Sequence, residues 1–223
     1  MFHVEHTQEE LLRSHLQWVL ETNKIHNLTA ITDEDEAWRL HVLDSLAVLP
    51  EMEAAPPGPL LDIGSGAGFP GVPLGIMSGR DTVCLDSVKK KSEALRTFLA
   101  GDARMNHIRT EALRAEELAL ALPAHFAVVV ARAVAPLPSL VELASPLLMI
   151  EGVCVCLKAK VTEEELAAGT AAAQHCGMVL QQVRNYLLED GDETRCVVEY
   201  RKASESSVPL PRRTGMAQKR PLR

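Results

Sequence analysis

The chain has 223 residues, with 23 lysines and arginines against 30 aspartates and glutamates, so its formal net charge is −7 at pH 7. This length leaves room for one α/β domain with an appendage and excludes two large domains. A composition of 47% hydrophobic and 24% charged residues excludes a chain that is disordered as a whole.

Residues 1–59 are predicted to form a helical extension. Apolar side chains recur with a helical period over residues 7–22 and again over 33–49. Pro50 and the proline-rich cluster at 56–59 should end the second helix.

Residues 60–200 change to short apolar runs that alternate with helical stretches, a pattern typical of a Rossmann-like α/β fold with a mostly parallel sheet. The last two of seven strands have no room for a helix between them, so we expect the final strand to be antiparallel. The pattern predicts strands near 60–63, 82–86, 106–110, 126–131, 152–158, 178–186 and 194–200. It predicts helices at 70–78, 88–101, 113–120, 138–149 and 162–175.

Residues 201–223 form a basic tail. They contain seven basic residues and one acidic residue, which gives this segment a charge of +6 and leaves −13 for the rest of the chain. A basic segment favours nucleic acid as a partner, despite the acidic total. A disordered, solubilising end is the alternative.

Membrane and metal partners are not expected. No apolar run reaches the roughly 18 residues that a membrane span needs, which favours a cytoplasmic protein. The five cysteines lack the spacing of metal ligands, so we expect buried free thiols and no bound metal.

The sharpest motif is a glycine-rich loop at 62–71, between a buried strand and a helix. Gly64, Gly66 and Gly68 allow a sharp turn and let a ligand approach the backbone amides. Asp62 would repel a pyrophosphate but suits a cation, so S-adenosylmethionine fits better than a nicotinamide dinucleotide. An ordinary glycine-rich turn is the alternative.

Two further positions suit a nucleoside. Asp86 ends the second strand, where a carboxylate accepts hydrogen bonds from a ribose, although it can also act as a helix cap. Ser87 and Val88 follow it and should line the adenine side. After the third strand, Ala115 and Glu116 can contact the adenine, but Glu116 suits a solvated helix face equally well.

Several runs together resemble the bacterial small-subunit rRNA guanine-N7 methyltransferase family, also called glucose-inhibited division protein B. The resemblance covers nearly the whole chain and rests on NLTAI at 27–31, RLHVLDSL at 39–46, the loop 62–71, LDS with three lysines at 85–91, VARA at 130–133 and LK at 157–158. It implies a class I S-adenosylmethionine-dependent methyltransferase that methylates N7 of guanine 527 in the decoding-region loop of 16S rRNA. It places the cofactor contacts on Gly64, Phe69, Asp86, Ser87, Val88, Ala115, Glu116 and Arg132.

The chemistry of this reaction needs few residues. Guanine N7 has a free lone pair at neutral pH, so alignment of the reactants can replace a general base and no catalytic dyad is expected. Arg132, at the end of the fourth strand, suits guanine O6 or the methionine carboxylate, with a phosphate clamp or a structural ion pair as the alternatives. His41 and Asp44 lie three residues apart and should support the cofactor cleft rather than form a triad with Ser45, with simple surface placement as the alternative.

RNA binding is expected from basic residues near the cleft and in the tail. The expected partner is 16S rRNA within the 30S subunit, and we expect the enzyme to be a monomer. Lys158, which ends the fifth strand, suits either an RNA contact or solvent. Three other interpretations stay open: a small-molecule methyltransferase, a nicotinamide-dependent oxidoreductase, and a noncatalytic RNA- or ribosome-binding module. The remaining candidate RNA contacts are Lys89, Lys90, Lys91, Arg96, Arg104, Arg212, Arg213, Lys219 and Arg220.

Overall fold

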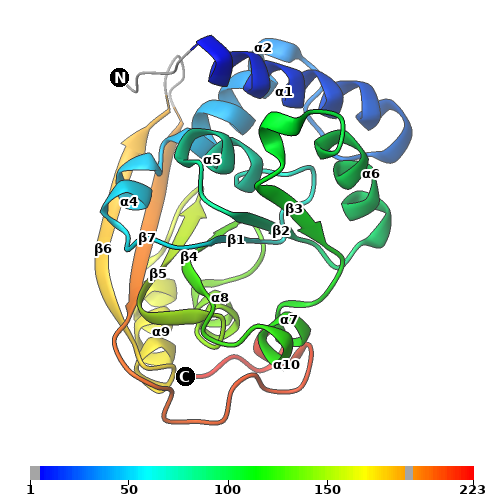
Figure 1. Cartoon of the computed structure of the whole chain (residues 1–223). Helices are drawn as coiled ribbons and strands as arrows, with labels where there is room; N and C mark the ends of the chain where they lie inside the picture. The colour runs from blue at the N-terminus through cyan, green and yellow to red at the C-terminus, as the bar shows by residue number, and fades with distance from the viewer. Residues whose placement is uncertain (1–5, 189–192) are drawn as a thin grey trace.

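A computed structural model of the chain describes residues 6–188 and 193–223. One seven-stranded sheet with the order β3-β2-β1-β4-β5-β7-β6 forms its centre (Figure 1). Only β7 is antiparallel to its neighbours β5 and β6, so the predicted α/β class and antiparallel last strand are confirmed. The strands are β1 Leu60–Ile63, β2 Thr82–Leu85, β3 Ile108–Glu111, β4 Phe126–Arg132, β5 Leu148–Lys158, β6 Met178–Leu187 and β7 Thr194–Lys202.

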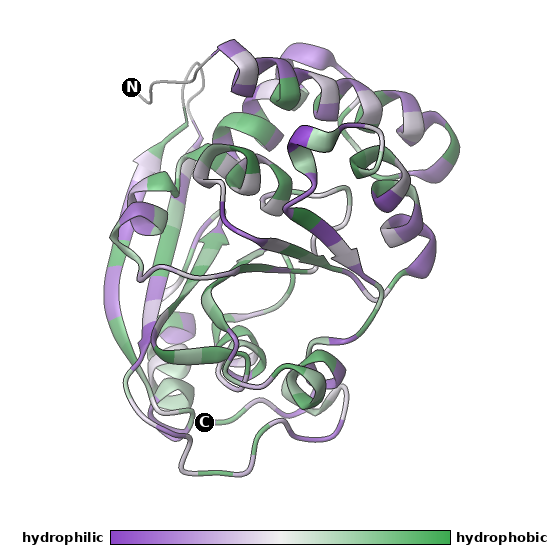
Figure 2. Ribbon diagram, in the orientation of Figure 1, coloured by the Kyte–Doolittle hydropathy of each residue, from purple (hydrophilic) through white to green (hydrophobic). Residues whose placement is uncertain are grey.

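The central strands are apolar throughout because helices cover both faces of the sheet. All residues of β1 and β2 are buried, as are the first six of β4. Side chains alternate between two hydrophobic cores, one under α1, α4, α5 and α6 and one under α7, α8, α9 and α10 (Figure 1). Figure 2 shows hydrophobic residues along the central strands and a mixture of hydrophilic and hydrophobic residues on the surrounding helices. The α-helices with their bounds are α1 His6–His26, α2 Glu34–Ala37, α3 Asp44–Leu46, α4 Leu49–Ala54, α5 Gly71–Ser78, α6 Lys89–Leu99, α7 Ala115–Ala121, α8 Leu137–Ala144, α9 Glu163–His175 and α10 Met216–Lys219.

The helical extension shares the core of the sheet domain. One face of α1 is buried through Leu12, Leu16 and Val19, which belong to the same apolar cluster as residues of α5 and α6. The extension is therefore part of one helical layer of the domain, with α1 packed against α5 and α6.

The expected helix at 33–49 is divided in the structure. A π-helical segment, Trp38–Leu43, separates α2 from α3, and α4 follows directly. Pro50 does not end this region as predicted, because it occupies the first turn of α4, where its missing N–H costs no hydrogen bond. A single π turn widens the backbone and commonly occurs at functional sites.

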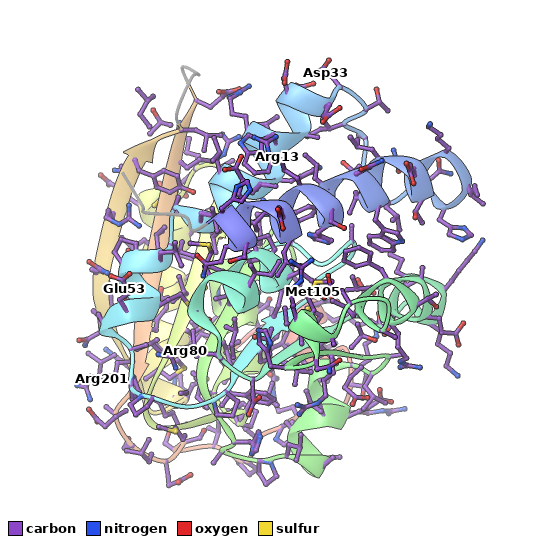
Figure 3. All side chains as sticks on the ribbon, turned by 45° about the horizontal axis from the view of Figure 1, so that its top comes forward. Arg13, Asp33, Glu53, Arg80, Met105 and Arg201 are labelled. Atoms are coloured by element: carbon purple, nitrogen blue, oxygen red, sulfur yellow. The ribbon has the colours of Figure 1, made fainter. Side chains whose placement is uncertain are left out.

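Arg80 fixes the connection between this extension and β1. Its guanidinium donates hydrogen bonds to the carbonyl oxygens of Met52 and Ala55, at 3.0 and 3.2 Å, and of Pro56 and Gly58, at 2.7 and 2.9 Å. Figure 3 labels Arg80 below α4. One side chain thus satisfies two carbonyl groups at the end of α4 and two in the loop that follows it.

The basic tail is docked against the sheet domain, so the alternative of a disordered end is wrong. Its first two residues continue β7 as far as Lys202. Further along, Ala217 is 2% exposed and its carbonyl oxygen accepts a hydrogen bond of 2.8 Å from the Ser139 hydroxyl.

All five cysteines are buried and free, as predicted. Within residues 6–188 and 193–223, no group of three or more His, Cys, Asp or Glu side chains could hold a metal ion. In the same residues, no helix is both long and apolar enough to cross a membrane.

Candidate active site

The glycine loop follows β1, next to the point between β1 and β4 where the order of the parallel strands reverses, which is where open α/β sheets bind ligands. The amides of Gly64 and Ser65 donate to the carbonyl oxygen of Leu85 at 2.8 and 3.0 Å. The amide of Gly66 donates to Asp86 Oδ2 at 2.9 Å. These bonds fasten the loop to the end of β2.

Two glycines of the loop have a positive φ, and one of them borders open space. Gly64 has φ +75°, and a Cβ there would lie 2.5 Å from Val134 Cγ2. Gly66 has φ +56°, yet a Cβ there would meet no atom within 4 Å. The backbone of Gly66 therefore borders open space, as a cradle for a bound cofactor requires.

Asp62 does not lie where the sequence placed it. Its side chain is fully buried beneath the loop, where Oδ2 accepts a hydrogen bond of 2.8 Å from the amide of Gly71. Burial raises the pKa of Asp62 to about 7, while the Gly71 hydrogen bond lowers it. The predicted electrostatic contact with a cation in the open cleft is therefore replaced by a hydrogen bond that holds the start of α5.

Both carboxylate oxygens of Asp86 accept hydrogen bonds from backbone amides. In addition to the Gly66 bond, its Oδ1 accepts from the amide of Val88 at 2.8 Å. Each oxygen keeps a second lone pair for a ligand hydroxyl. Ser87 and Val88 are exposed beside it.

We call the cavity beside Gly64 the smaller cavity. It has about 240 Å³ and is lined on one side by Asp86, Ser87, Ala115 and Glu116. The structure thus brings together the candidate nucleoside contacts from the ends of β2 and β3. It also adds an element that sequence reasoning missed, because Gly215 of the tail lines the same cavity.

The second cavity, the larger cleft, has about 600 Å³ and lies on the other side of the glycine loop. Four cationic side chains and three rings contribute to its wall, a combination that suits a nucleobase and its phosphates. The cations are Arg132, Lys158, Lys160 and Arg195, and the rings are His41, Phe69 and Tyr186.

Arg132 lines this cleft, and its side chain is 17% exposed. Its Nη1 donates to the carbonyl oxygen of Leu40 at 3.1 Å and to Asp44 Oδ2 at 3.0 Å. Its guanidinium carbon lies 5.6 Å from the centroid of the Phe69 ring. The π segment and the loop therefore fix the position of Arg132 together.

His41 lies within the π segment and stacks on Phe69, with ring centroids 4.9 Å apart and planes 19° apart. Burial and the nearby charge of Arg132 lower the pKa of His41 to about 4, so its ring is neutral at pH 7. Its Nε2 lies 2.8 Å from the Thr29 hydroxyl. His41 and Asp44 thus contact Arg132 from the helical extension and contribute to the wall of the cleft.

His15 is a site residue that sequence reasoning missed. It lies on the buried face of α1, fully enclosed, and its Nε2 is 2.8 Å from the carbonyl oxygen of Ala67 in the glycine loop. Burial lowers its pKa to about 4, so the neutral ring donates this hydrogen bond. The available signal was a histidine at an apolar position of an amphipathic helix.

Tyr186 and Arg195 were also missed. They are direct partners in the β6–β7 pairing, and both approach Asp44. The Tyr186 hydroxyl donates to Asp44 Oδ1 at 2.8 Å, and Arg195 Nε lies 3.7 Å from the same oxygen. Pairing the two predicted strands in register would have placed these side chains together.

The predicted RNA contacts fall into two groups. Lys158 forms an ion pair of 2.8 Å with Glu165 and is 16% exposed, and Arg212 pairs with the buried Glu142 at 2.6 Å, so neither is a free cation. Five other candidate RNA contacts are exposed: Lys89, Lys90, Arg213, Lys219 and Arg220.

A family model described as rRNA small subunit methyltransferase G matches residues 8–193. The chain belongs to this family. The chain is therefore a methyltransferase of small-subunit rRNA, and its cofactor is S-adenosylmethionine. Both predictions are confirmed. The alternative of a nicotinamide-dependent oxidoreductase is wrong.

Relatives of the rRNA small subunit methyltransferase G family match along nearly the whole chain. A protein of Carboxydothermus hydrogenoformans named ribosomal RNA small subunit methyltransferase G is 36% identical over 222 residues, which cover 98% of this chain and 94% of that protein. One of the same name from Clostridium novyi is 36% identical over 199 residues, covering 88% of this chain and 82% of that protein.

Solved structures support the fold alone. A putative sarcosine dimethylglycine methyltransferase from Galdieria sulphuraria has a TM-score of 0.53 at 11% identity and covers 73% of this chain and 86% of that one. A mutant 16S rRNA (adenine(1408)-N(1))-methyltransferase from Catenulisporales acidiphilia has a TM-score of 0.55 at 12% identity, covering 70% of this chain and 90% of that one. These neighbours share the class I methyltransferase architecture.

Proposed function

We propose that this member of the family methylates N7 of guanine 527 in 16S rRNA and releases S-adenosylhomocysteine. The observation that carries the proposal is the environment of Arg132, where a paired cation and neutral aromatic rings line one cleft. Such a cleft can hold and orient a purine whose reacting atom has no proton to lose.

No side chain described at the centre of the larger cleft is placed as a free general base. His41 is neutral, but Thr29 engages its Nε2 and Arg132 Nη2 lies 3.5 Å from its Nδ1. The Asp44 carboxylate is engaged by Arg132 and Tyr186. Guanine N7 needs no base, whereas an exocyclic amine or a ribose hydroxyl must lose a proton.

Arg132 orients the acceptor in this proposal. Its guanidinium has five N–H donors: the contacts with Leu40 and Asp44 use those of Nη1, and one of Nη2 faces His41 Nδ1. The second Nη2 donor and the Nε donor can bind guanine O6. Because Asp44 neutralises Arg132, the pair does not repel the positive charge that methylation places on the guanine ring.

The cofactor side is supplied by the glycine loop and the smaller cavity. Bound S-adenosylmethionine supplies an electrophilic methyl group. Gly66 offers an open approach to the backbone, Asp86 can accept hydrogen bonds from the ribose, and Ala115 and Glu116 border the adenine. Asp62 acts through the loop, since its carboxylate holds Gly71 from below.

The partner in this proposal is 16S rRNA within the 30S subunit, which implies a cytoplasmic enzyme without a membrane partner. The enzyme acts as a monomer in this proposal. Lys89 and Lys90 follow the Asp86–Val88 turn and are exposed, so they can bind phosphates beside the cleft.

The test uses methyl-labelled S-adenosylmethionine with 30S subunits and naked 16S rRNA that lack the modification. We expect one labelled 7-methylguanine at position 527, located by nuclease digestion and mass spectrometry. Absence of transfer to both substrates would contradict the proposal and favour a noncatalytic binding module or a small-molecule methyltransferase. Label at another guanine would contradict the position and keep the chemistry.

A further inference from the structure

The C-terminal segment, residues 212–222, lies against the smaller cavity. Gly215 and Gln218 line this cavity together with Asp86 and Glu116. The amide of Gly215 donates a hydrogen bond of 2.7 Å to Glu116 Oε1, so the segment is bonded directly to the residue at which the sequence placed an adenine contact. Figure 1 shows α10 beside α7, where Glu116 lies.

The segment is held in place by two buried contacts that precede Gln218 in the chain, at Arg212 and at Ala217. Arg212 Nε and Nη2 donate to the Glu142 carboxylate at 2.7 and 2.6 Å, and Glu142 is 3% exposed. Ala217, next to Gln218, is buried and accepts from Ser139. These anchors fix the backbone, so the location of Gln218 is set by the fold and not by chance.

The chemistry of Gln218 suits the edge of an adenine. A carboxamide has a donor and an acceptor side by side, as the N6 amino group and N7 of adenine require. Among the hydrogen bonds of residues 6–188 and 193–223, none involves the Gln218 side chain, and this side chain is exposed at the cavity. Apolar neighbours such as Leu113 and Ala115 can contact the faces of the base.

We propose that the C-terminal segment is a wall of the cofactor pocket and that Gln218 selects adenine by hydrogen bonds to its edge. The inference rests on the proposed function, since it requires the adenosine of the cofactor in the smaller cavity. It assigns the tail a role in cofactor binding, where the sequence had indicated RNA alone.

The experiment measures binding by calorimetry, on the full chain without RNA. The ligands are S-adenosylhomocysteine and S-inosylhomocysteine, in which an oxygen replaces the N6 amino group. We expect Gln218→Ala to weaken S-adenosylhomocysteine about tenfold, as the loss of hydrogen bonds to a ligand implies. The preference for adenosine over inosine should shrink from about tenfold to about twofold. The matched control is Thr214→Ala, at an exposed position of the same segment that does not line the cavity, and it should bind both ligands like the unchanged chain.

Hydrogen exchange gives a second readout on the unchanged chain. We expect S-adenosylhomocysteine to slow amide exchange in residues 215–219 as well as at 86–88. Protection at 86–88 alone, or an unchanged adenosine preference in Gln218→Ala, would overturn the inference and leave the proposed function intact. A wild-type chain that binds no S-adenosylhomocysteine would overturn both.

Discussion

Two buried polar side chains, His15 and Asp62, hold the backbone of the glycine loop by single hydrogen bonds to Ala67 and Gly71. Both are fully buried, and burial favours the neutral form of each: it lowers the pKa of His15 and raises the pKa of Asp62. The loop is therefore shaped by groups that a change of pH can charge, although neither borders the open clefts.

The stability of the protein should depend on pH through His15. Its pKa is about 4 in the folded chain and 6.5 when unperturbed. Between these values the unfolded chain binds a proton that the folded chain does not, so the free energy of unfolding falls as pH decreases from about 6.5 to about 4, by up to about 1.4 kcal/mol per pH unit. Asp62, with its raised pKa of about 7, contributes with the opposite sign.

His15→Gln separates the two contributions, since glutamine can donate to Ala67 without titrating. We expect the free energy of unfolding of the wild type minus that of this variant to rise from pH 4 to pH 6.5 and to be constant above. Urea unfolding at a series of pH values measures it. A difference that is independent of pH would show that His15 does not titrate in this way.

Arg132→Lys tests the positioning role of the guanidinium. Lysine keeps the charge and the ion pair with Asp44 but cannot also bind Leu40 and a guanine edge with a planar fork. We expect kcat for methyl transfer to fall about tenfold to a hundredfold, as the loss of a charged hydrogen bond implies. The Kd of S-adenosylhomocysteine should change less than about threefold, and a loss of cofactor affinity equal to the loss of kcat would place Arg132 at the cofactor carboxylate instead.

Among the secondary-structure elements, the positions of most helices and strands of the sheet domain followed from the periodicity of apolar residues, although the helix expected at 138–149 ends at 144 and β5 begins at 148. The main error was the helix expected at 33–49, because the apolar residues at 37, 40, 43 and 47 fit an α-helical period although residues 38–43 are π-helical. The sequence pattern also did not predict that the tail docks on α8, since this docking depends on a hydrogen bond between Arg212 and Glu142, which are 70 positions apart.

This docking predicts a stability difference between two adjacent arginines. Arg212→Met leaves the buried Glu142 without its guanidinium partner and should lower the free energy of unfolding by about 2–4 kcal/mol. Arg213→Met, at an exposed position, should change it by less than about 0.5 kcal/mol. Chemical denaturation compares them, and adding Glu142→Gln should recover part of the loss. Equal effects of the two arginine variants would contradict the docked arrangement.

For the whole molecule, a net charge of −7 coexists with an RNA substrate because the charges are separated in space. Exposed lysines at the start of α6 lie next to the Asp86 turn. Part of the basic tail is used internally, through the pair of Arg212 with Glu142. The basic residues left exposed, rather than the total, determine where RNA can bind.

Lys89→Ala combined with Lys90→Ala should weaken binding to 16S rRNA and reduce the dependence of log Kd on log salt by up to about 1.5, the equivalent of two phosphate contacts. Filter binding over a potassium chloride series measures this slope. The control is Arg201→Ala, a cation paired with Glu151 at the other side of the molecule from α6 (Figure 3). Equal slopes for both variants would contradict an RNA path along α6.

The sequence by itself determined the glycine loop, the strands that flank it and the acidic residue after β2. These features depend on backbone conformation and on apolar periodicity, which neighbouring residues control. Only the tertiary structure decided that Asp62 is buried, that His15 holds the loop, that Tyr186 and Arg195 reach Asp44, and that the tail reaches Glu116. Each of these facts concerns groups brought together by the packing of layers, as with Gly215 and Glu116, 99 positions apart, and local sequence patterns carry no information about such contacts.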